Sequence, residues 1–292
     1  MFSTFKMKSL MKLNYLCIGH CCHDMAGGNK ILGGTVSYSA LLAKEWSHNS
    51  AIITSVGNDF QFASKFKSLN IPLEIKRTRE TTTFENKYID GKRTQYLLAR
   101  AAVLTKSDIP EVYKEGYIIH FGSIANEIHP ELFTMFHDSF KGLSIQGLLR
   151  DWQSDGLVKP KGMDWSLLKN VDIVFLSDED ILGIEDCLNH IIKNCNHVVI
   201  THGKNGATIY LNEEKLFFPS FPTQELDPTG AGDTFTTAYL LEYSKSKEAR
   251  SACIYAHCAA SLIIETKGLF NVPTIKKVRD RYEEYLGMFL EL

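Results

Sequence analysis

The sequence predicts an α/β fold in which a mostly parallel central sheet is covered by helices on both faces. Short apolar runs alternate with longer amphipathic segments along much of the chain, and this order is typical of parallel strands joined by helical crossovers. The composition, 44% hydrophobic residues in a chain of 292, is sufficient for a large buried core. No repeat or low-complexity block interrupts the pattern. The chain is therefore expected to form one α/β domain, or two smaller ones.

Five short runs rich in Ile, Val, Leu and Tyr predict the buried strands of this sheet. They span residues 13–19, 51–57, 117–122, 171–177 and 197–201. Three amphipathic segments predict helices that cross from one parallel strand to the next, and they span residues 36–46, 130–140 and 179–194. Two further strands are expected at residues 207–211 and 215–219.

The segment 81–98 departs from this order and predicts a β-hairpin. Two alternating runs flank Asp90-Gly91, and Asp-Gly favours a tight turn because both central residues take positive φ. The strands are rich in Thr, Lys, Arg, Glu and Gln. We therefore expect either a lid that leaves the main sheet or an antiparallel extension of the sheet edge.

The C-terminal part predicts helices. Residues 249–264 are rich in Ala and suit close packing. Further on, a stripe of apolar side chains runs along a charged helix, and it predicts a buried face rather than a cofactor site. The stripe consists of Ile275, Val278, Tyr282, Tyr285 and Phe289.

The charge balance argues against nucleic acid or an anionic membrane as a partner. The 32 Lys and Arg residues are matched by 34 Asp and Glu residues, with no long run of one sign, so the basic footprint of such proteins is missing. Seven cysteines without regular spacing predict no disulfide framework and favour a cytoplasmic protein. Lysines interrupt every apolar run in residues 1–12, so we interpret this segment as a weakly ordered tail rather than a signal peptide.

The stretch most informative about function is Asp227-Pro228-Thr229-Gly230-Ala231-Gly232-Asp233-Thr234. Asp-Pro favours a turn, two glycines let the backbone bend tightly, and the following apolar residues predict a helix whose first amides are unpaired. Because these amides and the positive end of the helix dipole converge, the stretch predicts a site for a phosphate or an oxyanion. Asp233 is then either an ordinary helix N-terminal acid or a base for the attacking nucleophile.

This octet resembles the C-terminal signature of the ribokinase family, the PfkB-type carbohydrate kinases. The resemblance implies a ribokinase-like three-layer domain over residues 1–292, with a small β-lid from residues 25–31 and 73–103. It also implies ATP-dependent phosphorylation of a hydroxyl group on a small polyhydroxylated substrate, with Asp233 as base and Gly230, Ala231 and Gly232 as anion hole. At a helix N-terminus we expect Asp233 to be a weak base, because the dipole favours its ionised form.

Near the N-terminus, the run His20-Cys21-Cys22-His23 precedes Asp24. The run does not have the ligand spacing of a structural zinc site, and adjacent residues of an extended chain point to opposite sides. Asp24 follows the first predicted strand, at the edge where parallel α/β sheets bind ligands. The resemblance implies that Asp24 holds substrate hydroxyls.

Gly33-Gly34 leads into the first predicted helix. The pair is an ordinary loop when taken alone, but it resembles the N-terminal Gly-Gly motif of the family, where the backbone closes on the substrate. Tyr38 stands where the family usually carries Asn, which departs from simple ribose-type or fructose-type recognition. In the central region, Gln146 and Arg150 match the family's Asp-Pro-Asn-x-Arg element. Arg150 is either a surface residue or a phosphate ligand with forked donors.

The segment Thr201-His202-Gly203-Lys204-Asn205-Gly206 resembles the family's Thr-x-Gly-x-x-Gly loop, which lies against ATP phosphates. It implies nucleotide contacts by Thr201, Gly203 and Gly206. His257 lies on a segment similar to the family's adenine-side helix. The sequence contains no Gly-x-x-x-x-Gly-Lys-Ser/Thr P-loop, so phosphate binding depends on a different loop design.

Ser177 and Asp180 stand where the family carries an Asn-x-x-Glu element associated with Mg²⁺. Both keep an oxygen, so a water-mediated Mg²⁺ role remains chemically sound, and the same pair predicts a capped helix start. Asp227, with carbonyls around residues 264–268, resembles the monovalent-cation site of several members, which implies an ion such as K⁺.

The acceptor is the least determined part of this prediction. Segments around Gly33, at 124–128 and at 146–150 are similar to the inositol kinase branch, so a cyclitol such as myo-inositol is one candidate. A sugar kinase and a nucleoside kinase of the same family are alternatives. A nucleotide- or sugar-binding homologue without catalysis is a further alternative, based on the altered Ser177 and Asp180. The lid strands could also pair across a homodimer.

Overall fold

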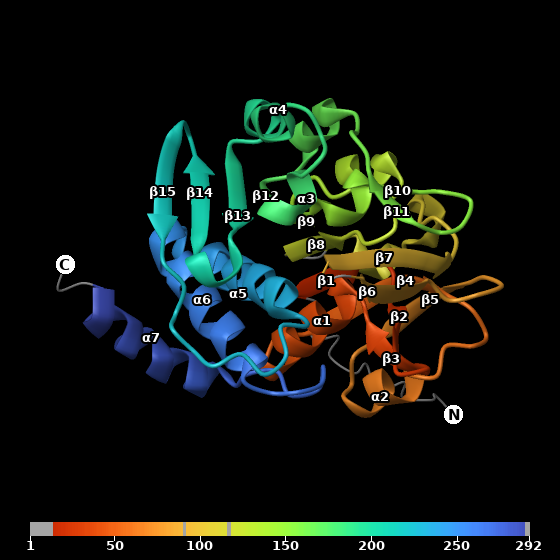
Figure 1. The fold of residues 1–292 in the computed structure, drawn as a ribbon, viewed down its shortest axis with the longest axis horizontal. Helices are drawn as coiled ribbons and strands as arrows, with labels where there is room; N and C mark the ends of the chain where they lie inside the picture. The colour runs from red at the N-terminus through yellow and green to blue at the C-terminus, as the bar shows by residue number, and fades with distance from the viewer. Residues whose placement is uncertain (1–13, 90–91, 116–117, 290–292) are drawn as a thin grey trace, which may run out of the picture.

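The computed structural model describes residues 14–89, 92–115 and 118–289. At its centre is a nine-stranded sheet in the order β15-β14-β13-β12-β9-β8-β1-β4-β5 (Figure 1). Neighbours from β13 to β5 are parallel, and β14 and β15 form an antiparallel edge. The predicted α/β class with a mostly parallel sheet is confirmed. The strands are β1 (Tyr15–Ile18), β4 (Ser50–Val56), β5 (Leu73–Arg77), β8 (Ile118–Gly122), β9 (Phe140–Ser144), β12 (Ile173–Ser177), β13 (His197–Thr201), β14 (Ala207–Leu211) and β15 (Glu214–Phe218).

Strand β1 shows why both faces of the sheet are covered. Tyr15 and Cys17 belong to the hydrophobic core on one face, whereas Leu16 and Ile18 belong to the core on the other. Because successive side chains of a strand point to opposite faces, a strand that is apolar at every position must be buried on both. One face carries α1 (Thr35–Glu45), α5 (Ala231–Ser246), α6 (Ala249–Ile264) and α7 (Ile275–Phe289), and the other carries α4 (Cys187–Asn194) with the 3-10 helices η3 (Pro130–Thr134) and η5 (Trp165–Asn170) (Figure 1).

The remaining short helices lie in connections. They are α2 (Ala63–Ser68), α3 (Asp178–Ile181), η1 (Lys106–Asp108), η2 (Glu111–Tyr113), η4 (Ile145–Leu149) and η6 (Gly203–Asn205). The predicted stripe on α7 is confirmed as core: Val278 and Tyr285 are buried, and the other members are partly buried and pack against the same core.

The prediction of a helix over residues 130–140 was wrong. The chain forms only the 3-10 turn η3 and then enters β9 at Phe140. Leu132, Phe133 and Phe136 are almost fully buried, and Phe133 meets the ring of Phe121 edge-on at 4.9 Å between centroids. The short turn and the two residues after it therefore place all three apolar side chains in the core, and their helical spacing did not require a full helix.

The prediction of one helix over residues 179–194 was also wrong. The segment divides into α3 and α4. Gly183 and Asp186 between them adopt φ of 80° and 51°, a left-handed conformation that an α-helix cannot contain. Gly183 was the sequence signal for this break.

A second sheet of four strands, in the order β3-β2-β6-β7, lies at the right of Figure 1, and we refer to it as the lid because it contains the segments for which a lid was predicted. Its strands are β2 (Cys22–Ala26), β3 (Asn29–Gly33), β6 (Thr83–Ile89) and β7 (Lys92–Ala99). The predicted hairpin is present, with its turn at residues 90–91 outside the described residues. The alternative of an edge extension is wrong, because β6 pairs with β2 rather than with the large sheet. The lid boundary also needs correction, since β5 pairs with β4 in the large sheet and lies outside the lid.

A short hairpin connects the lid to the central region. Strands β10 (Arg150–Trp152) and β11 (Val158–Pro160) pair with each other, and the amide of Leu97 in β7 donates to the carbonyl of Gly156 at 2.8 Å. Gly156 has φ of 87°, and a Cβ there would stand 2.6 Å from the Leu97 carbonyl oxygen. Only glycine permits this approach.

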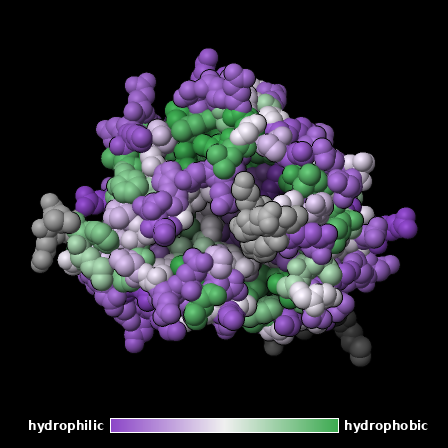
Figure 2. Space-filling view, in the orientation of Figure 1, coloured by the Kyte–Doolittle hydropathy of each residue, from purple (hydrophilic) through white to green (hydrophobic). Residues whose placement is uncertain are grey.

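The face shown in Figure 2 is mostly hydrophilic, with its largest hydrophobic patch near α3 and α4 and smaller ones elsewhere. Among the described helices, none combines the length and apolar character required to cross a membrane. The predicted N-terminal tail, residues 1–12, lies outside the described residues.

Candidate active site at the carboxyl ends of the parallel strands

The predicted anion cradle forms at the N-terminus of α5. Gly230 is the N-cap residue, with φ of 81°, which is the left-handed region that favours glycine. The amide of Ala231 donates to the Pro228 carbonyl at 3.2 Å, so it is already engaged. The amides of Gly232 and Asp233 lie in the first turn of α5, where a helix supplies no acceptor. They are the donors best placed for an anion.

Asp233 is half-buried in the first turn of α5. Burial raises its pKa to about 6. The negative charges of Asp24 and Asp180 raise the pKa further. A hydrogen bond from the Thr35 hydroxyl and the positive charge of Arg150 act in the opposite direction. The expectation of a weak base was therefore wrong, because desolvation and like charges outweigh the favourable effects. A carboxylate with this pKa is better suited to accept a proton near neutral pH.

Asp24 lies on lid strand β2 rather than in a loop after β1. A Cβ on Gly33 would stand 2.0 Å from Asp24 Oδ2, and a Cβ on Gly34, whose φ is 95°, would stand 2.4 Å from the His20 carbonyl oxygen. The Gly-Gly pair therefore makes room for the Asp24 carboxylate and for the backbone beside it.

Tyr38 is 5% exposed and lies on α1. Its ring packs against the anion cradle, since a Cβ on Gly230 would stand 2.1 Å from Tyr38 Cε1. Burial, followed by the negative charges of Asp233 and Asp24, raises the pKa of the Tyr38 hydroxyl. Tyr38 is therefore a neutral wall of the site.

Gln146 and Arg150 both lie at this end of the sheet. The Gln146 side-chain amide donates to Asp180 Oδ1 at 2.8 Å. Arg150 donates to the Ile124 carbonyl at 3.2 Å, lies 5.8 Å from the centre of the Phe84 ring, and influences the charge of Asp233. Arg150 is thus half-buried, bound to neighbouring groups, and close enough to Asp233 to lower its pKa.

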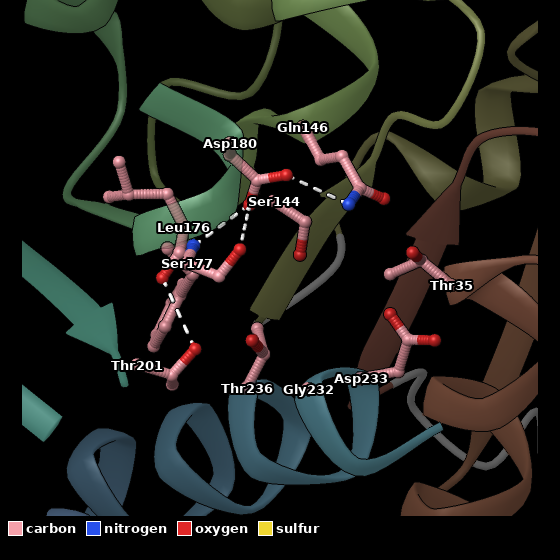
Figure 3. Close-up of a pocket in the computed structure, with 11 residues that line it drawn as sticks. Thr35, Ser144, Gln146, Leu176, Ser177, Asp180, Thr201, Gly232, Asp233 and Thr236 are labelled. Atoms are coloured by element: carbon pink, nitrogen blue, oxygen red, sulfur yellow. Dashed lines mark hydrogen bonds between the residues drawn. The ribbon is translucent and has the colours of Figure 1, made fainter. Parts of the chain in front are cut away.

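A cavity of about 110 Å³ joins several of these groups. Figure 3 shows Thr35 and Asp233 on one side of it and Gln146, Asp180 and Ser177 opposite them. The cavity is lined by Thr35, Ser144, Gln146, Phe175, Leu176, Ser177, Asp180, Thr201, Gly232, Asp233 and Thr236.

A larger pocket of about 430 Å³ lies on the other side of Gly232 and Thr201, which line both spaces. Its lining brings together four residues predicted to contact a nucleotide: Thr201, Gly203, Gly206 and His257. His257 is 5% exposed, and burial lowers its pKa to about 4, against the effect of a hydrogen bond to the Phe218 carbonyl. The imidazole is therefore neutral at pH 7.

The candidate Mg²⁺ residues form the capping box that the sequence also predicted. Asp180 Oδ2 accepts hydrogen bonds from the Ser177 amide at 2.8 Å and from its hydroxyl at 2.9 Å. No group of three or more His, Cys, Asp or Glu side chains that could hold a metal occurs in residues 14–89, 92–115 and 118–289. This donor set fits a Mg²⁺ held mainly by phosphates and water, with Asp180 as an outer contact.

The candidate monovalent-cation residue, Asp227, has its carboxylate in a local turn. Asp227 Oδ1 accepts from the Thr229 amide at 3.0 Å, and the amides of Leu226 and Asp227 donate to the Ile264 carbonyl. Asp227 therefore lies next to the end of α6, as the resemblance implied, although the Ile264 carbonyl is already a hydrogen-bond acceptor.

One residue of the site was missed from the sequence. Thr35 lines the cavity with Asp233 and lowers the pKa of its carboxylate through a hydrogen bond. Thr35 was signalled only by its position directly after Gly33-Gly34.

Two curated proteins illustrate the similarity in sequence. The chain is 26% identical over 291 residues to "Inositol 3-kinase" of Arabidopsis thaliana, covering 92% of this chain and 79% of that protein. It is 23% identical over 300 residues to "Nucleoside kinase" of Methanocaldococcus jannaschii, covering 92% of this chain and 96% of that protein.

Two solved structures illustrate the similarity in fold. One is a pyrophosphate-dependent kinase in the ribokinase family complexed with a pyrophosphate analog and myo-inositol, with a TM-score of 0.75, 21% identity, and coverage of 91% of this chain and 99% of that chain. The other is a fructokinase from Xylella fastidiosa with bound ATP, with a TM-score of 0.76, 17% identity, and coverage of 94% and 99%. The ribokinase-like fold is thereby confirmed.

Residues 20–275 match the pattern described as "pfkB family carbohydrate kinase". The match spans well over half of the 292 residues, and it confirms the resemblance and the phosphotransferase class that the octet implied. The chain belongs to the pfkB family of carbohydrate kinases.

Proposed function

We propose that this kinase transfers the γ-phosphoryl group of ATP to a hydroxyl group of a small polyhydroxylated acceptor, with a cyclitol such as myo-inositol as the first candidate. The observation that carries the proposal is the position of Asp233. It has a pKa raised to about 6, it lines the cavity that also contains Gln146, and it directly follows Gly232, which lines both this cavity and the nucleoside-sized pocket.

In this mechanism Asp233 accepts the proton of the acceptor hydroxyl as that oxygen attacks phosphorus. The hydrogen bond from Thr35 orients the carboxylate. The amides of Gly232 and Asp233, with the dipole of α5, stabilise the charge on the transferring phosphoryl group. Arg150 adds a positive charge on the acceptor side. When bound, Mg²⁺ would neutralise phosphate charge, and most of the catalysis is positioning and electrostatic stabilisation.

The second pocket supports ATP rather than pyrophosphate as the donor. Its apolar lining includes Phe221, Phe235 and Ile264, and a base and ribose would fill such a space whereas pyrophosphate would leave it empty. One structural neighbour is pyrophosphate-dependent, so the two donors must be compared directly.

A nucleoside acceptor is the second candidate. The relatives include both an inositol kinase and a nucleoside kinase, so the two acceptor classes must be compared directly.

A kinetic screen of the purified chain tests the proposal. Cyclitols, pentoses, hexoses and nucleosides would each be paired with ATP and, separately, with pyrophosphate. We expect turnover with ATP and the highest kcat/KM on a cyclitol. Turnover on nucleosides alone would contradict the cyclitol acceptor and favour a nucleoside kinase. Turnover with pyrophosphate alone would contradict ATP as the donor. ATP binding without turnover would favour the inactive homologue.

Three further predictions belong to the same proposal. K⁺ would bind near Asp227 and increase activity.

The lid would form a homodimer contact, since Ile31 and Leu98 on edge strands β3 and β7 are 44% and 53% exposed. A cytoplasmic location is supported by the seven cysteines, all of which are free and buried.

A further inference from the structure

Helix α7 does not line the nucleotide pocket, but one of its arginines, Arg281, contacts residues that do. Arg281 Nη1 donates to Glu265 Oε1 at 3.0 Å and to Ser261 Oγ at 3.0 Å, and its Nη2 donates to Glu265 Oε2 at 3.2 Å. The guanidinium also lies 4.7 Å from the centre of the Phe221 ring. Its side chain is 16% exposed, so these contacts are shielded from solvent.

The partners of Arg281 lie on both walls of the pocket. Ser261 lies on α6, and Phe221 and Thr223 lie on the segment that precedes the anion cradle; all three line the pocket. The Thr223 hydroxyl donates to Glu265. Although burial acts in the opposite direction, hydrogen bonds from Arg281 and Thr223 hold the pKa of Glu265 below its ordinary value. The guanidinium and Glu265 therefore join the two walls.

The wall that contains Phe221 has no regular secondary structure, although the Phe221 ring itself is buried in the core. Residues 219–230 form no helix or strand, and the amides of Leu226 and Asp227, in its second half, bond to the Ile264 carbonyl. The first half is held by side chains: Tyr285 of α7 donates to the Pro219 carbonyl at 2.8 Å, and Ser220 donates to the Lys204 carbonyl. Helix α7 therefore contributes to its position through Tyr285 and through Arg281.

We propose that Arg281 is a positioning residue for the nucleoside end of the donor, acting through Phe221 and Glu265. The inference rests on the proposed use of ATP. It assigns Arg281 no contact with the phosphates, because its partners line the wall of the pocket and not the cradle at Gly230. A planar guanidinium can bind a carboxylate with two hydrogen bonds and stack on a ring at the same time, which a lysine cannot do.

The experiment compares Arg281→Gln with Arg279→Gln in the full chain. Arg279 lies on the same helix and is exposed, so the control removes the same charge without touching the pocket. For Arg281→Gln we expect a KM for ATP raised about 5- to 30-fold, since a charge-assisted pair and a cation–π contact are lost. The KM for the acceptor and the inhibition constant of inorganic tripolyphosphate should stay within about twofold of wild type. Arg281→Lys should reverse only a small part of the increase in the KM for ATP seen in Arg281→Gln.

Two results would overturn the inference. One is an unchanged KM for ATP in Arg281→Gln, and the other is an equal weakening of ATP binding and tripolyphosphate binding, which would indicate a general effect on the fold. If Arg281→Gln does not fold, Phe221→Leu tests the same wall and should weaken the binding of ATP but not that of tripolyphosphate.

A wild-type chain that binds ADP in calorimetry but transfers no phosphate would refute the proposed function, and ADP binding by the variants would still decide the role of Arg281. A wild-type chain that does not bind ADP would refute both.

Discussion

The ring of Tyr38 lies directly against Gly230, so close that a Cβ on the glycine would stand 2.1 Å from Tyr38 Cε1. The tyrosine belongs to α1 and the glycine caps α5. The residue that departs from the family's usual asparagine is therefore in contact with the anion cradle, and it restricts which residue can occupy the start of α5.

We expect Gly230→Ala to lower kcat about 10²-fold or more, because displacement of the cradle by even an ångström is costly to positioning. Two causes act together, the φ of 81° and the clash with Tyr38. The double variant Tyr38→Ala/Gly230→Ala removes the clash but leaves the backbone strain, so it should recover part of the lost kcat. Steady-state kinetics would measure both, and a double variant no better than Gly230→Ala would show that the contact is unimportant.

Asp233→Asn should lose turnover while it keeps nucleotide binding. A general base contributes about 10²- to 10⁴-fold, and the amide occupies the same space without accepting the proton. Single-turnover kinetics would measure the loss, and calorimetry with ADP would check that the pocket is intact. A kcat like that of wild type would exclude Asp233 as the base.

The pH dependence of kcat/KM should report the ionisation of Asp233. Because the base must be deprotonated, activity should fall as the pH decreases through about 6, the raised pKa of Asp233. Asp24→Asn removes a charge that raises this pKa and should move the acid limb to lower pH, whereas Thr35→Val removes a hydrogen bond that lowers it and should move the limb to higher pH. Shifts in the same direction would contradict the assignment.

The same carboxylate should reduce stability near neutral pH. A folded pKa of about 6, above the ordinary 3.8, means that the folded state binds more protons between these values, so this contribution to stability declines as the pH rises from about 4 to 6. Asp233→Asn should therefore be more stable than wild type at pH 7.5, by at most about 3 kcal/mol, and the difference should vanish near pH 3.5. Denaturant unfolding at both pH values would test this; a variant less stable at pH 7.5 would disprove it.

Local signals predicted the parts of the site that are local. The turn at Asp227-Pro228, the glycine at the start of α5 and the capped start of α3 follow from a few adjacent residues each, and they form as expected. The contact of Tyr38 with Gly230 could not be predicted in this way, because the large sheet brings α1 and α5 together from opposite ends of the chain. The raised pKa of Asp233 was missed for the same reason: the helix dipole is visible in the sequence, whereas burial and the charges of Asp24 and Asp180 arise only on folding.

The hydrogen bond between Leu97 and Gly156 has a kinetic consequence. It joins lid strand β7 to the hairpin that begins with Arg150. The lid therefore cannot move away from this hairpin unless the bond breaks or the hairpin moves with the lid. Under the proposed function, entry of the acceptor and release of the phosphorylated product would both require this movement. The bond would then slow both steps, whereas it takes no part in the transfer itself.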